Sequence, residues 1–204
     1  LSLEKLVEAP LRTIATDLAS INPFVRLKAV NAVASRKENK ELQVLTDHLV
    51  NEENEYVLSR ILTTIGLLGQ KEDSALASLL MGFMNHSDER IVANAIEAAT
   101  KLKLNSLDPQ IRPFLVSENS RLRANALLFL ADCPTLDIAK ELSSMSLHNE
   151  DAMHLSAIYI VEQLAKDQPE LVAQLTPLCQ SQSGPVHFSL LEALERLAES
   201  GNDN

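Results

Sequence analysis

Histidine is the side chain in this sequence best suited to catalysis or metal binding, and the chain has five of them. His154 and His187 lie at equivalent positions of two adjacent copies of a sequence repeat. Helices that pack side by side are about 8–10 Å apart, whereas the ligands of one zinc ion lie about 2 Å from the metal. No third ligand follows at a suitable spacing, so we expect no metal site.

Other patterns of catalytic residues are missing from the sequence. None of the five histidines is followed by Glu, and there is no Ser-His-Asp constellation with a nucleophile elbow. Gly66 and Gly69 have no Gly-rich phosphate loop around them and indicate a loosened helix end instead. We therefore expect no catalytic residue, no cofactor and no enzymatic activity.

Composition restricts the class of partner and the compartment. A net charge of -10 would repel nucleic acid and anionic bilayers, so neither is an expected partner. No apolar run approaches the roughly 20 residues of a membrane span. Two cysteines do not make a disulfide framework and favour a cytoplasmic protein. Because the sequence begins at Leu1 and not at Met, we expect a piece of a larger protein.

Apolar residues recur along the chain with a period near 32 residues. Within Ser87–Leu102 they occupy one side of a helix, at steps of 4, 5, 8 and 11 from Ile91. The position of Ile91, called the anchor position here, is apolar in six copies: Val25, Val57, Ile91, Leu122, Met153 and Val186. Arg36 is the one break in the apolar register of these copies. Self-similarity of this period is typical of a solenoid built from helical units.

Each copy is expected to be the second helix of a helical hairpin, because another apolar-periodic segment precedes it. The predicted second helices are about 23–36, 55–69, 88–102, 120–132, 151–166 and 185–199. The preceding segments at 109–116 and 169–179 contain prolines, so we expect at least the first to be short or bent. The predicted fold is all-α, a right-handed α-solenoid of about six hairpins that forms one domain over residues 1–200, with a tail at 201–204.

The second-helix pattern resembles that of the HEAT repeat family, in its short type of about 30 residues per repeat. The resemblance covers nearly the whole chain and rests on PFVRLKAVNAV, DERIVANAIEAATKL and SRLRANALLFL. Arg26 and Arg123 match the Arg that commonly follows the anchor in that family, and Leu58, Val92, His154 and His187 depart from it. The resemblance implies a concave face, lined by second helices, that binds other molecules.

Two rows of residues are expected on that concave face. Three residues after the anchors the row runs from cationic to neutral, through Lys28, Arg60, Asn94 and Asn125, and six residues after them stand Leu128 and Tyr159. An aromatic side chain with an aliphatic neighbour and amides nearby is typical of protein-binding surfaces. An alternative is that a neighbouring helix covers Leu128 and Tyr159, and that the polar row is a solvated helix face.

The predicted function is a non-catalytic scaffold that binds a protein or peptide, as a docking or regulatory module whose partners include other domains of the same polypeptide. The resemblance leaves a second class open, because bilin lyases and their accessory proteins share the short repeat. Some HEAT-like proteins are DNA glycosylases, which use a strongly basic groove with aromatic side chains. This chain has no Trp and a net charge of -10, which disfavours that activity.

Overall fold

The computed structural model describes residues 11–37 and 39–201, and these contain helices and turns with no strand. The expectation of an all-α fold is therefore confirmed for this part of the chain. The chain divides into two compact units, Leu1–Ile111 (unit 1) and Arg112–Asn204 (unit 2). A single domain over residues 1–200 stays a prediction. Gly201 ends the last helix, and the rest of the predicted tail lies outside the described residues.

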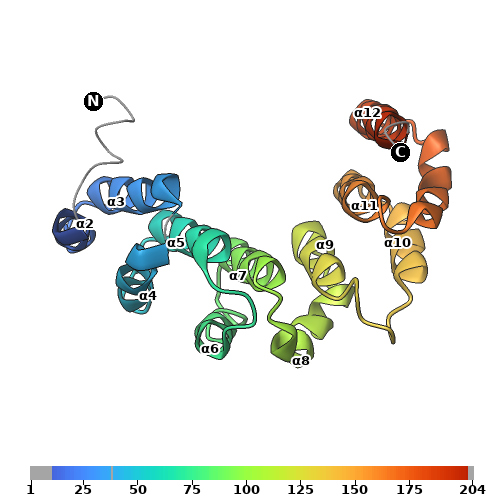
Figure 1. Cartoon of the computed structure of the whole chain (residues 1–204). Coiled ribbons are helices and arrows are strands. Elements are labelled where there is room, and N and C mark those ends of the chain that lie inside the picture. The colour runs from blue at the N-terminus through green and yellow to red at the C-terminus, as the bar shows by residue number, and fades with distance from the viewer. Residues whose placement is uncertain (1–10, 38, 202–204) are drawn as a thin grey trace. The chain divides into compact units, whose positions relative to one another are not determined.

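Unit 1 contains three helical hairpins. Their first helices are α2 (Leu11–Leu18), α4 (Leu42–Leu49) and α6 (Ser74–Met81), and their second helices are α3 (Pro23–Arg36), α5 (Glu55–Leu68) and α7 (Glu89–Lys101). The short helices η1 (Asn39–Glu41), η2 (Asn105–Leu107) and α8 (Asp108–Ile111) complete the unit. Figure 1 shows α3, α5 and α7 side by side in one layer, with α4 and α6 in a second layer.

Unit 2 repeats this plan with more 3-10 helix. It consists of η3 (Arg112–Val116), α9 (Ser120–Phe129), α10 (Ile138–Ser146), α11 (Asp151–Leu164), η4 (Pro169–Gln180) and α12 (Gly184–Gly201). Pro113 and Pro177 lie inside the two 3-10 segments, where the missing proline N–H prevents regular α-helix. Each of the six second helices of the chain begins within one residue of the start expected from the sequence.

A polar cap begins the second helix in four of the six hairpins, three residues before the anchor. Asn22, Asn54, Asp88 and Asn119 each accept hydrogen bonds from one or two backbone N–H groups of the first turn. Such a cap contributes about 1 kcal/mol and fixes the residue at which the helix begins. The repeat therefore encodes helix starts as well as an apolar face.

The core consists of the periodic apolar positions. In α5 the side chains of Ile61, Leu62 and Ile65 have no exposed surface, and the equivalent residues of α7, α9 and α11 are buried as well. The last second helix, α12, differs, because Leu191 is 51% exposed and Leu194 is half-buried. No described helix follows α12 to cover that side.

The break in the apolar register at Arg36 is compensated by an ion pair. The Arg36 guanidinium donates to Oε1 of Glu41, and the two side chains are 9% and 0% exposed. A charge in a core is tolerated when it is paired and hydrogen-bonded. The sequence alone shows the exception in α3 but not the partner, which lies in η1 at the start of the next hairpin.

Gly66 has a different role from the one expected. It lies inside α5, where a Cβ would be 2.8 Å from the Cα of Ala98 in α7. The interpretation of a loosened helix end is therefore wrong for Gly66, which allows the backbones of α5 and α7 to approach closely. Gly69 does follow the last residue of α5, as its C-cap.

Candidate binding surface on the second helices

In unit 1 the predicted cationic residues lie on neighbouring second helices. Lys28 of α3 is exposed, and Arg60 of α5 is half-buried. The Nε of Arg60 donates to Oδ1 of Asn31, at 2.6 Å. This bond joins the residue three after one anchor to the residue six after the preceding one. The two rows predicted from the sequence are therefore neighbours at this point of the surface.

The two predicted asparagines are mostly covered. Asn94 is 5% exposed and Asn125 is 9% exposed. The Nδ2 of Asn94 donates to Oγ of Ser59, which ties α7 to α5. A buried amide with a protein partner stabilises the stack. Little of either amide remains accessible to a ligand.

In unit 2 the second helices carry several apolar side chains on their exposed faces. Tyr159 of α11 is 48% exposed, and Leu128 of α9 is half-buried. Leu155 is 36% exposed and precedes Tyr159 by four residues, so the two side chains share one face of α11. Leu155 is not among the residues predicted from the sequence, although its spacing from Tyr159 was a usable signal.

Phe188 of α12 extends this surface. Two hydrogen bonds fix the register of α11 and α12: Ser183 Oγ donates to Asp151 Oδ2 at 2.5 Å, and Arg196 Nε donates to Glu162 Oε1 at 2.7 Å. The helices are therefore parallel, and Phe188 lies at the level of Leu155. Phe188 is 64% exposed. We call Leu128, Leu155, Tyr159 and Phe188 the apolar strip.

The histidines that invite a metal-site interpretation do not converge. His154 Nε2 lies 2.6 Å from the carbonyl oxygen of His148 and makes a hydrogen bond there, and His187 is exposed. Across residues 11–37 and 39–201, no three His, Cys, Asp or Glu side chains are grouped so that they could hold a metal ion. No helix in the same residues has the length and apolar character to cross a membrane.

The two arginines shared with the HEAT pattern link successive hairpins. Arg26 of α3 donates two bonds of 2.7 Å to the carboxylate of Glu52, in the turn before α5. Arg123 of α9 donates to Ser144 of α10 at 2.9 Å and pairs with Glu141. The position after the anchor thus faces the next hairpin and contributes to the stacking.

Glu52 is a buried carboxyl of unit 1 whose pKa lies well below its usual value. Burial of its side chain raises its pKa, but hydrogen bonds from Arg26, from the backbone N–H of Asn54 and from His48 lower it to about 2, below the usual 4.5. The folded state therefore binds fewer protons than the unfolded state between these two pH values.

We expect the contribution of Glu52 to stability to be complete above pH 4.5 and to decline as the pH falls toward 2. The measurement compares the free energy of unfolding of the wild type with that of Glu52→Gln across this range. Because the other carboxyls are common to both proteins, the difference isolates Glu52. A difference that stays constant down to pH 2 would contradict the assignment.

No protein-family model and no curated protein matches the chain. Solved structures of similar fold include the designed armadillo repeat protein YIII(Dq)4CqI, with 17% identity, a TM-score of 0.50, and 92% of this chain and 100% of that chain covered. Another is the designed armadillo repeat protein YIII(Dq.V1)4CPAF in complex with the peptide (KR)4, with 12% identity, a TM-score of 0.53, and 93% and 100% covered. An engineered protein has 15% identity and a TM-score of 0.52, and the match covers 93% of this chain and 98% of that protein. Together with the all-helical hairpins, these likenesses identify the fold as an α-solenoid of helical repeats.

Proposed function

We propose that this chain is a non-catalytic repeat scaffold of the HEAT type, which binds a segment of a partner protein across the exposed faces of its second helices. It acts as a docking or regulatory module of a larger, cytoplasmic protein. Neither Cys133 nor Cys179 is part of a disulfide among the described residues, which is consistent with that compartment.

The observation that carries the proposal is the apolar strip. Tyr159 and Phe188 are exposed by 48% and 64%, at positions that the core of the hairpins does not require. Exposed aromatic side chains grouped with aliphatic ones are enriched in the centres of protein interfaces. Their hydration is unfavourable in the free chain, so burial beneath a partner would be a source of affinity.

The similarity in fold adds support of a general kind. A designed armadillo repeat protein was solved in complex with the peptide (KR)4, so a protein of stacked helical repeats can bind a peptide. Solenoids of this class present continuous rows of side chains from successive repeats. Recognition of a linear segment is therefore the function best matched to this architecture.

Support for the HEAT type comes from Arg26 and Arg123. Both follow an anchor residue, and both bond to the next hairpin. A positively charged residue at that point links repeats electrostatically, and the equivalent residue of α7 is Val92, which is 3% exposed. The family assignment rests on this pattern of contacts and on the sequence resemblance.

The test is selection of short random peptides, displayed on phage, on the immobilised chain. Among the enriched peptides we expect a class rich in aromatic and aliphatic residues, whose affinity falls about tenfold or more in a variant carrying Tyr159→Ala and Phe188→Ala. Leu128 is left unchanged because it is half-buried and its truncation would disturb packing.

The matched control is Tyr56→Ala, because Tyr56 is an aromatic residue exposed by 70% on α5 of unit 1, outside the apolar strip. It should leave the affinity of that peptide class within about twofold. The proposal would be rejected if no enriched peptide distinguished the double variant from the wild type, or if Tyr56→Ala weakened the same peptides equally.

A further inference from the structure

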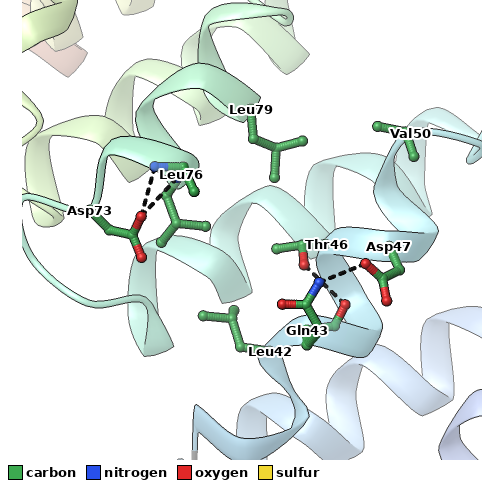
Figure 2. A pocket seen from close by; sticks show the side chains of 9 residues that line it. Leu42, Gln43, Thr46, Asp47, Val50, Asp73, Leu76 and Leu79 are labelled. Atoms are coloured by element: carbon green, nitrogen blue, oxygen red, sulfur yellow. Dashed lines mark hydrogen bonds between the residues drawn. The ribbon is translucent and has the colours of Figure 1, made fainter.

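A groove of about 580 Å³ lies in unit 1 between the first helices α4 and α6. Leu42 and Val50 contribute apolar surface from the α4 side, and Leu76 and Leu79 from the α6 side. Figure 2 shows these side chains around the groove, with Asp47 on α4 and Asp73 at the N-terminus of α6. Val50 is 66% exposed, although it directly follows the buried Leu49.

The groove exists because the two layers of unit 1 pack differently. The second helices α5 and α7 approach so closely that Gly66 is required against Ala98. The first helices pack against their own second helices, α4 on α5 and α6 on α7. The space between α4 and α6 is therefore left open by the stacking itself and lined by residues from two successive hairpins.

The charged groups of the groove, Asp47 and Asp73, are both acidic. Oδ1 of Asp47 accepts a hydrogen bond from Nε2 of Gln43 at 2.7 Å, and Oδ1 of Asp73 accepts from the backbone N–H groups of Ala75 and Leu76. The second oxygen of each carboxylate has no hydrogen-bond partner among the described residues. None of the nine lining residues is Lys, Arg or His.

This combination specifies the chemistry of an occupant. Aliphatic side chains at the centre favour aliphatic or aromatic groups, and a carboxylate on each wall favours a cation next to them. The net charge of -10 attracts a basic segment to the chain as a whole. The amide of Gln43 and the hydroxyl of Thr46 also line the groove and are suited to hydrogen bonds with a peptide backbone.

We propose that the groove between α4 and α6 is a second docking site, which takes a short segment of a partner protein with Lys or Arg next to large apolar residues. The site is separate from the apolar strip. A partner could therefore be held by unit 1 through charge and apolar contacts while unit 2 binds an apolar segment.

The test uses the same selection of random peptides on phage, now scored against groove variants. We expect a second class of enriched peptides, rich in Lys or Arg beside Leu, Ile or Phe, whose affinity falls about tenfold or more in a variant carrying Asp47→Asn and Asp73→Asn. Asn retains helix-capping ability, so α6 should remain intact. Ala75→Trp, which fills the groove without changing its charge, should weaken the same peptides.

The matched control carries Glu53→Gln and Asp132→Asn, two exposed carboxylates outside the groove. It removes the same net charge and should change the affinity by less than about twofold. Equal weakening by the control would mean unspecific attraction by net charge and would overturn the proposal. So would a selection without any peptide that depends on Asp47 and Asp73. Because these variants leave Tyr159 and Phe188 intact, failure here is distinguishable from failure of the apolar strip.

Discussion

Replacing Glu52 by Ala should lower the free energy of unfolding by about 3 kcal/mol, because it removes one partner of a buried ion pair and leaves the other. The Glu52 side chain is 1% exposed and that of Arg26 is 15% exposed. In the variant the Arg26 guanidinium would keep its bonds to the carbonyl oxygens of Ser20 and Ile21 but lose both bonds to the carboxylate. Urea unfolding followed by circular dichroism measures the change.

Glu53→Ala is the matched control, since Glu53 is the neighbouring residue in the same turn and is exposed. It should change stability by less than about 0.5 kcal/mol. If the two variants were equally stable, Glu52 would not hold successive hairpins together, and the role assigned to Arg26 in the stacking would be wrong.

Gly66→Leu should destabilise unit 1 by about 3 kcal/mol through overpacking. Its Cβ would lie 2.8 Å from the Cα of Ala98 and 3.0 Å from the Ala98 Cβ, so α5 and α7 would have to separate. The sign of the change in stability is informative. At a solvent-exposed helix position Leu is more stable than Gly by roughly 0.8–1 kcal/mol, so without a clash the substitution would stabilise the protein. Thermal and urea unfolding give the measurement.

Gly184→Leu provides the comparison, because an added Cβ there meets no atom within 4 Å. We expect its stability to change by less than about 1 kcal/mol. Stabilisation by Gly66→Leu would contradict the close packing of α5 against α7. It would favour the earlier interpretation, in which Gly66 loosens the helix end.

The all-helical fold and the positions of the second helices could be predicted because they depend on patterns within a few turns of chain. Anchors, capping residues and apolar steps recur at one period, and the solvent-excluded face follows from that period alone. The short 3-10 segment that contains Pro113 was predictable for a similar reason, since proline disrupts the α-helix in its own turn.

Features that depend on a neighbouring hairpin could not be predicted in the same way. The pairing of Arg36 with Glu41 and the close approach at Gly66 need the separation and register of adjacent helices. Burial of Asn94 has the same origin, because it follows from contact with Ser59. Of the apolar strip, Tyr159 and Leu128 were predicted from their positions in the repeat, whereas Phe188 required the register of α11 and α12.

The bonds between successive second helices have a consequence for how the chain is made. They join residues 29 to 35 positions apart, as in Arg60 with Asn31, Arg90 with Glu55 and Arg196 with Glu162. Closing loops of this modest length costs little entropy, and such local contacts favour fast folding. Each hairpin can pack against the preceding one as soon as it has left the ribosome, so the repeats can fold one after another during translation.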